Sequence, residues 1–522
     1  MTSHVPTATS VNDIYPHDVI RGLNGQARRW LHLLVKFQEI YKCPADFVSR
    51  SPGRHIDYML YEVLPMAINA DLLIAVAVRP LEASDSTSKI RIRNINSSKF
   101  ADREFLVPSK GDVAIDASVN EWSNYFKSGL RGALELLRRK RGGKEFSPVG
   151  MDLLVDGTIP SGGGLSSSAA FVCASALAVT VANGEKMVDK TELVELAVVS
   201  ERAVGVNSGG MDQSASVFSL RGTALYVSFM PTLRTRAIRF PATQPELTFL
   251  IAQTFVQADK HVTGPVNYNL RVVECTLAAE VLAKKLGLKK PLPKDAGPLG
   301  VSLRGLQDLY YEEMEGVADN NKTPPHEFHK QLEHILQLSK ESLTATAGYT
   351  REEIASILGI TIGSLDERYT SRFPVHTERF LLRQRAQHVL TEALRVLDFM
   401  SLLESPPEDS ESLLRGLGAI LNASQQSCRD LYNCSCPELD QLCQLALGAG
   451  AYGSRLTGAG WGGCSVHLVP LDKVEAVKEV WEKEYYRKHF PDISDERLRE
   501  AVVVSKPGSG SYLFKVPGSE VL

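Results

Sequence analysis

One short segment gathers three side chains that could bind a polar ligand. In "SPGRHIDY", residues 51–58, Arg54, His55 and Asp57 lie within four positions, between a turn signal and a long apolar run. A guanidinium, an imidazole and a carboxylate supply the donors and acceptors that hold the hydroxyl groups of a sugar. A turn followed by an exposed strand would explain the same residues, so the octet alone leaves both interpretations open.

A second segment has the composition of a loop that binds an anion. It reads "IPSGGGLSSSAAF", and its candidate ligands are Gly162, Gly163, Gly164, Ser166, Ser167 and Ser168. Glycines let backbone N–H groups approach an anion closely, and the positive end of the following helix points at the loop. The serine hydroxyls are suited to phosphate oxygens or to Mg²⁺. No lysine follows the glycines, so this is not a P-loop, and an ordinary turn with a serine N-cap is the alternative.

Three further positions are ambiguous when they are taken singly. Asp212 follows two glycines in "GVNSGGMDQ", where it is either an N-cap or a catalytic carboxylate. Tyr268 begins an expected helix in "NYNLRVVE" and is either a ligand contact or a core aromatic. The segment 452–469 contains five glycines, and a tight turn where two backbones meet would explain them.

The elements that must position these residues alternate between strands and helices. Helical spacing predicts helices over 20–42, 118–140 and 166–183, and a mostly helical region over 266–445. Runs of β-branched residues predict the strands, at 46–51, 63–78, 88–95, 151–159, 223–229, 247–254, at the end of the glycine-rich segment and within 501–516. Mixed strands and helices indicate an α+β fold in two lobes with a boundary near residue 240.

Composition excludes several classes of protein. The 522 residues have 43% hydrophobic and 23% charged content, as in globular proteins, and the net charge of −3 gives no case for nucleic acid. No apolar run is long enough for a membrane span, so no membrane partner is expected. The polar opening lacks the order of a secretion signal, and the eight cysteines form no CxxC pair. Reduced thiols in the cytoplasm are the expected state.

The order of the motifs resembles that of the GHMP small-molecule kinases. "SPGR", "GGGLSSSA", "GGMDQ" and "LTGAGWGGC" follow one another along the chain, and "EWSNYFK", "GVNSGGMDQ", "NYNLRVVE" and "GSRLTGAGWGGC" are similar to the galactokinase branch in its fungal form. The resemblance runs from about residue 20 to the C-terminus. It implies a two-lobed GHMP kinase fold with the active site in the cleft between an N-terminal lobe (1–240) and a C-terminal lobe (241–522). A helical insertion is expected at about 290–420.

The resemblance also implies an activity and a role for each candidate residue. Galactokinases use ATP and Mg²⁺ to phosphorylate galactose at O1, which gives galactose 1-phosphate. The glycine-serine loop would then bind ATP, with Ser166 also reaching the metal. Asp212 matches the catalytic aspartate, Arg54 matches the arginine that keeps it ionised, and Tyr268 matches the tyrosine that lines the sugar. His55 and Asp57 match the sugar-binding cluster, and the loop 458–463 would support the site from the second lobe.

Two departures from the family pattern accompany these matches. About six residues are absent between Arg54 and His55, including the sugar-binding glutamate, which indicates either an error in the gene model or a weakened sugar site. Several relatives carry a metal-binding glutamate where this chain has Val172.

Other functions within the family stay open at this stage. One is a galactose sensor that captures a transcriptional repressor, although the sensor lacks two residues of the serine loop and "GGGLSSSAA" has its full length here. Another is an N-acetylgalactosamine kinase.

Overall fold

The computed structural model describes most of the chain. The described residues are 3–15, 25–52, 60–79, 87–107, 111, 113–116, 119, 121–143, 146–160, 165–201, 209–256, 264–371, 373–519 and 521. Helices and strands mix along this part of the chain, as the sequence predicts.

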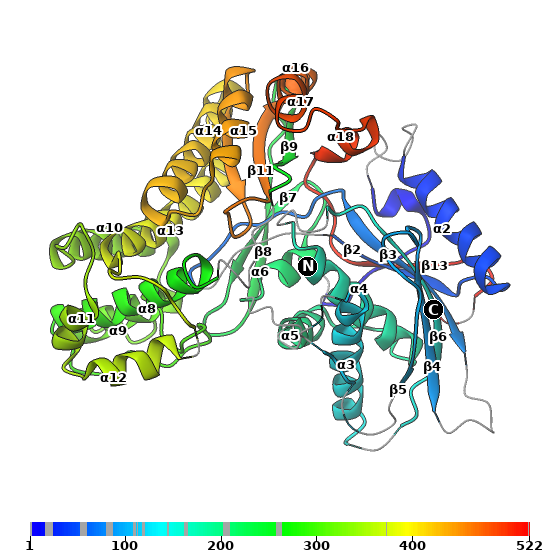
Figure 1. The fold of residues 1–522 in the computed structure, drawn as a ribbon, viewed down its shortest axis with the longest axis horizontal. Coiled ribbons are helices and arrows are strands. Elements are labelled where there is room, and N and C mark those ends of the chain that lie inside the picture. Colours follow the sequence, from blue (N-terminus) through cyan, green and yellow to red (C-terminus); the bar gives the residue numbers. More distant parts are fainter. Residues whose placement is uncertain are drawn as a thin grey trace.

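A seven-stranded mixed sheet forms one half of the molecule, seen on the right in Figure 1. Its strands, in spatial order, are β1 (Thr7–Ala8), β13 (Tyr512–Lys515), β2 (Phe47–Pro52), β3 (Asp71–Arg79), β6 (Gly150–Gly157), β4 (Ser88–Asn94) and β5 (Arg103–Val107). The sheet therefore takes one strand from the C-terminal end of the chain, which a division at residue 240 assigns to the other half.

Helices cover both faces of this sheet. On one face lies α2 (Gln26–Tyr41), and on the other lie α3 (Ser123–Lys140), α4 (Ser167–Ala182), α5 (Lys190–Glu201) and α6 (Met211–Phe218). The central strand β3 shows why both faces are covered. Its side chains Leu72, Ile74 and Val76 belong to the core beneath α3 to α5, whereas Leu73, Ala75 and Ala77 belong to the core beneath α2. A continuous apolar strand is the pattern of a sheet that is buried on both sides.

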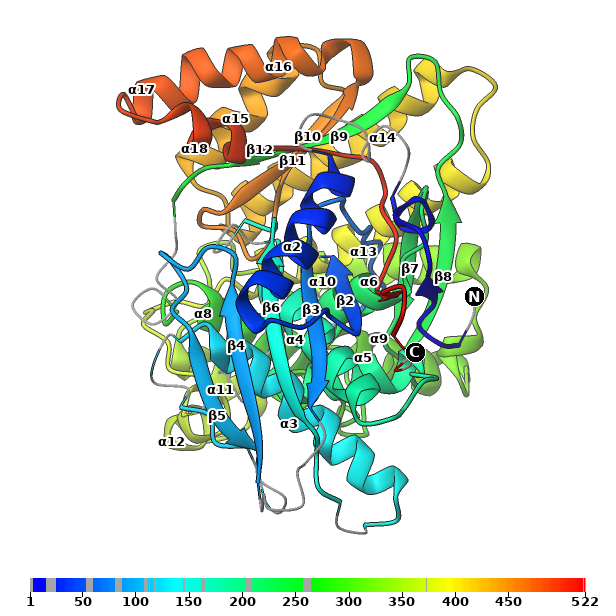
Figure 2. The same cartoon turned by 90° about the vertical axis from the view of Figure 1, so that its right-hand side faces the viewer.

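A four-stranded antiparallel sheet forms the second half. Its order is β10 (Gly453–Thr457), β11 (Cys464–Pro470), β9 (Leu247–Gln253) and β12 (Val502–Ser505). The helices near it are α15 (Pro437–Gly448), α16 (Val474–Trp481), α17 (Arg487–His489) and α18 (Asp495–Ala501), which Figure 2 shows at the top with the sheet. A two-stranded sheet of β7 (Thr223–Ser228) and β8 (Arg234–Arg239) precedes it in the chain.

A group of helices occupies the left of Figure 1 and contains the largest apolar core of the described chain. Its members are α8 (Tyr268–Lys285), α9 (Leu303–Glu315), α10 (Pro325–Ser342), α11 (Arg351–Leu358), α12 (Ile362–Leu365), α13 (Leu382–Glu404) and α14 (Ser410–Ser427). The expected helical region is confirmed.

Two expectations about strands need correction. The chain is not a strand over 63–70, because Pro65 has no N–H to donate to a ladder. Within that range Val63 and Ala67 form isolated bridges, to Val227 and Gly508. The glycine-rich segment is a hairpin with a strand on each side of its turn, since β10 precedes the glycines. The strand β8 was not predicted, since its charged sequence "RTRAIR" carries little apolar pattern.

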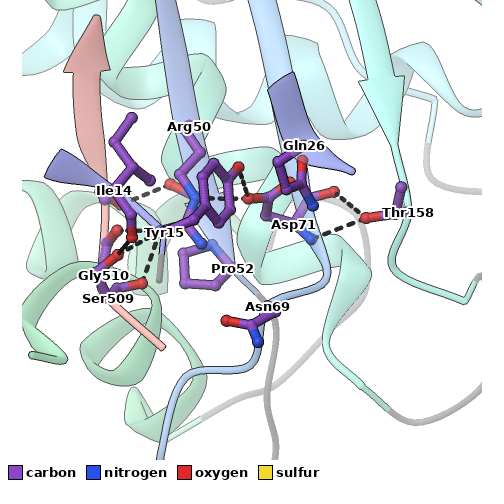
Figure 3. A network of polar contacts seen from close by, with 12 residues as sticks. Ile14, Tyr15, Gln26, Arg50, Pro52, Asn69, Asp71, Thr158, Ser509 and Gly510 are labelled. Atoms are coloured by element: carbon purple, nitrogen blue, oxygen red, sulfur yellow. Dashed lines mark hydrogen bonds and ion pairs between the residues drawn. The ribbon is translucent and has the colours of Figure 1, made fainter. Parts of the chain in front are cut away.

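A buried charged cluster sits where β3 begins (Figure 3). The Asp71 carboxylate is fully buried and accepts from Arg50 Nε at 2.6 Å, from Arg29 Nη1 at 2.5 Å and from the Tyr15 hydroxyl. Its backbone is paired too, because Thr158 N donates to Asp71 O at 2.9 Å and Asp71 N donates to Thr158 Oγ1 at 3.1 Å. We call Tyr15, Arg29, Arg50, Asp71 and Thr158 the Asp71 cluster.

The charge of Asp71 is maintained by its two arginines. Burial alone would raise the pKa of this carboxyl, but the guanidinium groups of Arg50 and Arg29 outweigh that effect, so its pKa lies below the ordinary value. Removing one partner from a buried ion pair leaves the other charge uncompensated in the interior. The cluster therefore ties together the N-terminal segment, α2, β2, β3 and the end of β6.

We expect Asp71→Asn to lower the free energy of unfolding by about 3–5 kcal/mol at pH 7, because two guanidinium groups lose their counter-charge. The matched control is Asp102→Asn, which removes an exposed ion pair to Arg93 (3.0 Å) and is expected to cost under about 1 kcal/mol. Because the folded pKa is depressed, the stabilisation is complete above about pH 4 and is lost as the pH falls below it. Urea unfolding from pH 7 to pH 3 measures both effects; a difference between wild type and Asp71→Asn that stays constant down to pH 3 would contradict them.

Candidate functional site

The structure describes five of the eleven candidate site residues. These are Ser166, Ser167, Ser168, Asp212 and Tyr268, whereas Arg54, His55, Asp57, Gly162, Gly163 and Gly164 lie outside the described residues.

Ser166 directly precedes the N-terminus of α4, but its side chain does not cap the helix. Its backbone is left-handed (φ 55°), and its side chain makes no capping hydrogen bond. The hydroxyl is buried and has no hydrogen-bond partner among the described residues. The serine N-cap that the sequence offered as an alternative is therefore wrong for Ser166. An unpaired buried hydroxyl beside a helix N-terminus is suited to an anionic or metal ligand.

The helix behind this hydroxyl is held rigidly by small residues. Every residue of α4 from Ala169 to Ala182 is buried. Against α3 the approach is close, since a Cβ on Gly129 would lie 2.7 Å from Val172 O. Val172, the position at which the sequence departs from the expected family pattern, is fully buried in the apolar core. Among the described residues, no group of three or more His, Cys, Asp and Glu is arranged to hold a metal ion.

Asp212 lies in the first turn of α6 and is 7% exposed. The turn before it needs glycine, because Gly210 has φ 110° and a Cβ there would lie 3.2 Å from Val198 Cγ2. The helix α6 packs on α4. Burial raises the pKa of the Cys173 thiol on α4, and the carboxylates of Glu201 and Asp212 add to that effect. Asp212 is therefore close to the helix that begins at the serine loop.

Tyr268 is the first residue of α8 and is half-buried, with its ring against the large apolar core. One turn later, a buried ion cluster fixes the helix. Glu274 Oε2 accepts from Arg271 Nη1 at 2.9 Å and from Arg385 Nε at 2.7 Å. Arg271 also donates to Tyr432 O at 2.6 Å, and its guanidinium lies 5.8 Å from the centre of the Trp461 ring. The beginning of α8 is thus linked to the glycine-rich hairpin.

The glycine-rich turn between β10 and β11 lies in close contact with two other backbone segments of the chain. A Cβ on Gly460 would lie 1.9 Å from Cys434 O, and one on Gly462 would lie 2.5 Å from Val256 O. Hydrogen bonds hold the same contacts, from Trp461 N to Cys434 O (2.7 Å) and from Gly463 N to Val256 O (2.9 Å). Close backbone approach therefore accounts for glycine at both positions.

The segment that carries Arg54, His55 and Asp57 is anchored at both of its described flanks. On the N-terminal side, Pro52 O accepts from the Ser216 hydroxyl of α6. On the C-terminal side, the Tyr61 hydroxyl donates to Gln307 Oε1 at 2.9 Å, and Glu62 Oε1 pairs with Arg304 Nη1 at 3.3 Å. Through these flanks the segment is joined to α6, the helix that carries Asp212, and to α9 of the helical region.

Sequence reasoning missed the residues that connect these elements. Arg50 and Asp71 are charged residues in buried strands. A charge beside an apolar run was the signal from which they could have been found. Ser216, Ser509 and Ser511 gave no such signal, because isolated serines occur throughout the chain.

Comparison with known proteins agrees with this arrangement. The family model described as "GHMP kinases N terminal domain" matches residues 124–219, and "GHMP kinases C terminal" matches residues 410–488. A third model, "Galactokinase galactose-binding signature", matches residues 35–78. These ranges take in α3 to α6, the hairpin and the segment of the opening octet.

Relatives of similar length match over nearly the whole chain. A galactokinase of Saccharomyces cerevisiae is 41% identical, over 93% of this chain and 94% of its own length. One of Schizosaccharomyces pombe is 39% identical, over 94% and 95%. The fold is similar to the crystal structure of Lactococcus lactis galactokinase complexed with galactose, with a TM-score of 0.61, 23% identity, and coverage of 92% of this chain and 99% of the other.

We expect Gly460→Ala to lower the free energy of unfolding by about 3 kcal/mol or more, since the new Cβ meets a backbone oxygen and φ is +87°. Gly518→Ala is the matched control: φ there is +90°, but no atom lies within 4 Å, so only the backbone strain of about 1–2 kcal/mol applies. Urea unfolding of the two variants separates the clash from the strain. Equal losses would mean that the contact with Cys434 is unimportant.

Proposed function

Since the chain belongs to the galactokinase branch of the GHMP kinase family, we propose how its residues phosphorylate galactose. The phosphoryl donor is ATP, and the proposed acceptor is the O1 hydroxyl, which gives galactose 1-phosphate. The observation that carries the assignment of the site is the buried Ser166 hydroxyl, which has no hydrogen-bond partner among the described residues. It lies at the N-terminus of a helix that packs on the helix of Asp212.

The serine loop is the proposed site for the triphosphate. Backbone N–H groups of Gly162, Gly163 and Gly164 and the first turn of α4 would neutralise phosphate charge. Ser166, Ser167 and Ser168 would supply hydroxyl donors at the start of the same helix. In phosphoryl transfer, most of the rate enhancement comes from such positioning and charge neutralisation.

Asp212 is the proposed catalytic aspartate. With an ordinary pKa of about 3.9 an aspartate is a weak base, so its main task is to orient the sugar hydroxyl and accept the proton late, as the oxygen becomes more acidic. Arg54 is the proposed neighbour that keeps this carboxylate ionised.

Galactose itself is proposed to bind Arg54, His55, Asp57 and Tyr268. The galactose-binding signature spans the first three, and Tyr268 comes from the other half of the chain. The departure noted after Arg54 shortens this segment, so the anchoring of its flanks by Ser216 and Arg304 gains importance.

Mg²⁺ is the proposed metal, and Ser166 fits it. The Ser166 hydroxyl is a hard oxygen ligand that is buried and unpaired among the described residues. Magnesium is commonly bound through few protein oxygens together with the phosphates of the substrate. When bound, it would neutralise charge on the phosphoryl oxygens.

The division into lobes and the cellular location are proposed as well. The lobes are proposed to be 1–240 and 241–522, apart from β13, which joins the sheet of the first. The active site is proposed to lie between them, with the helical insertion at about 290–420. A cytoplasmic location is proposed from the thiols, since all eight cysteines are free. Among the described residues, no helix combines the length and apolar character that crossing a bilayer requires.

We expect the unsubstituted protein to consume ATP in the presence of galactose, and Asp212→Ala to lower kcat by about 10²–10⁴-fold because the hydroxyl loses its orienting group. Binding of a non-hydrolysable ATP analogue, measured by calorimetry, should stay within about threefold. Ser214→Ala, which removes a buried hydrogen bond to Gly210 O (2.7 Å) in the same turn, is the control and should keep kcat.

The outcomes of this assay separate the functions. Equal loss of turnover and nucleotide binding in Asp212→Ala would mean that the residue is structural. Turnover with N-acetylgalactosamine in preference to galactose would indicate the related kinase. Galactose-dependent binding of a transcriptional repressor without turnover would indicate a sensor.

We expect Ser166→Ala to raise the KM for Mg-ATP about tenfold, because a hydrogen bond to a charged ligand is lost. Ser175→Ala is the matched control: this hydroxyl lies on the same helix and is likewise buried without a partner among the described residues, but it faces α3. Steady-state kinetics with saturating galactose compare the two. An equal KM in both variants would contradict the role of Ser166.

A further inference from the structure

The C-terminal end of the chain contacts the helix of the proposed catalytic aspartate. Between β12 and β13, Ser511 Oγ donates to Ser216 O at 2.8 Å, and Gly510 N donates to Ser219 O at 2.8 Å. The contact is tight, because a Cβ on Gly510 would lie 2.5 Å from Val217 O. All three contacts fall at the last turn of α6, one turn after Asp212.

The same C-terminal segment is held from its other side by the Asp71 cluster. Arg50 Nη1 donates to Ser509 O at 2.7 Å and to Gly510 O at 2.6 Å, while its Nε binds Asp71 (Figure 3). The hydroxyls of Ser511 and Ser51 lie 2.6 Å apart. The segment is therefore fixed to β2 by hydrogen bonds from the Arg50 guanidinium to two of its backbone oxygens and by the hydrogen bond between Ser51 and Ser511.

The helix α6 makes its own contact with β2. Its Ser216 hydroxyl donates to Pro52 O, at the end of the strand that leads to Arg54. Ser216 thus uses its side chain to bind β2 and its backbone oxygen to bind the C-terminal segment. Three parts of the chain that are more than 150 residues apart meet at one residue.

An eight-residue helix depends on such contacts for its position. Helices this short are not stable in isolation, so packing and tertiary hydrogen bonds decide where they lie. Asp212 and Ser216 are joined by one helical turn, so a shift of the last turn moves the carboxylate with it. A displacement of about 1 Å at a reacting group is enough to cost about 10²-fold in rate.

We propose that Ser511 is a positioning residue for phosphoryl transfer: its hydrogen bond to Ser216 O holds α6 so that Asp212 meets the sugar hydroxyl. Ser511 does not touch the substrates and acts through α6. The proposal rests on the role of Asp212 given under the proposed function. It assigns Ser511 to the active-site architecture.

The test compares Ser511→Ala with Ser509→Ala. The two serines are two residues apart and both nearly fully buried. The Ser509 hydroxyl donates to Ile14 O (2.6 Å) and accepts from Arg50, so its bonds within the described part of the chain go to elements other than α6. We expect Ser511→Ala to lower kcat and the single-turnover rate about tenfold, with the KM for ATP within about twofold. Ser509→Ala should lower the melting temperature by a similar amount and leave kcat within about twofold.

Each remaining outcome decides the question. An equal fall of kcat in both variants, or an unchanged kcat in Ser511→Ala, overturns the proposal. If Ser511→Ala does not fold, Ser511→Cys carries the test, because its thiol replaces the hydroxyl with a weaker donor. An intermediate kcat supports the proposal and a wild-type kcat overturns it. If Asp212→Ala retains phosphoryl transfer, both this proposal and the role of Asp212 are wrong. If Asp212→Ala loses transfer but Ser511→Ala has normal kinetics, only the positioning role of Ser511 is wrong.

Discussion

The Asp71 carboxylate brings a full charge into the interior of a sheet that helices cover on both faces. Such a charge is tolerated only when opposite charges and hydrogen bonds surround it. Arg50, Arg29 and Tyr15 supply them, and each comes from a different part of the chain. The need to neutralise this one group therefore specifies how the N-terminal segment, α2 and β2 meet around the start of β3.

The elements of the proposed active site are connected to the Asp71 cluster. Thr158, which pairs with the Asp71 backbone, lies a few residues before the serine loop. Arg50 lies two residues before Pro52, which precedes the proposed sugar-binding segment, and it also binds the C-terminal segment that contacts α6. The proposed phosphate loop, sugar segment and catalytic helix are thus connected to one buried cluster. A site built on such rigid supports keeps the geometry that phosphoryl transfer requires.

A second buried carboxylate between two arginines lies in the other half of the molecule. Glu274 binds Arg271 and Arg385 in the interior of the helical region, and these arginines reach the turn at 431–433 beneath Trp461. The hairpin glycines and the start of α8 are fixed by the same network. Each half therefore orients its own contribution to the site through a buried carboxylate with two arginines, while the surrounding apolar side chains supply most of the burial.

The sequence by itself determined the chemistry and the class of fold. Glycines before serines, Asp212 after a glycine pair and the order of the motifs identified the family, and helical or alternating periodicity located most elements, because these signals are local. Tertiary structure alone decided which elements meet. That β13 joins the first sheet, that the Ser166 hydroxyl is buried without a partner in the described part of the chain, and that Ser511 reaches α6 depend on contacts between residues that are far apart in the chain. An isolated serine or arginine has the same local pattern whether it faces solvent or a buried partner, so only the fold distinguishes the two.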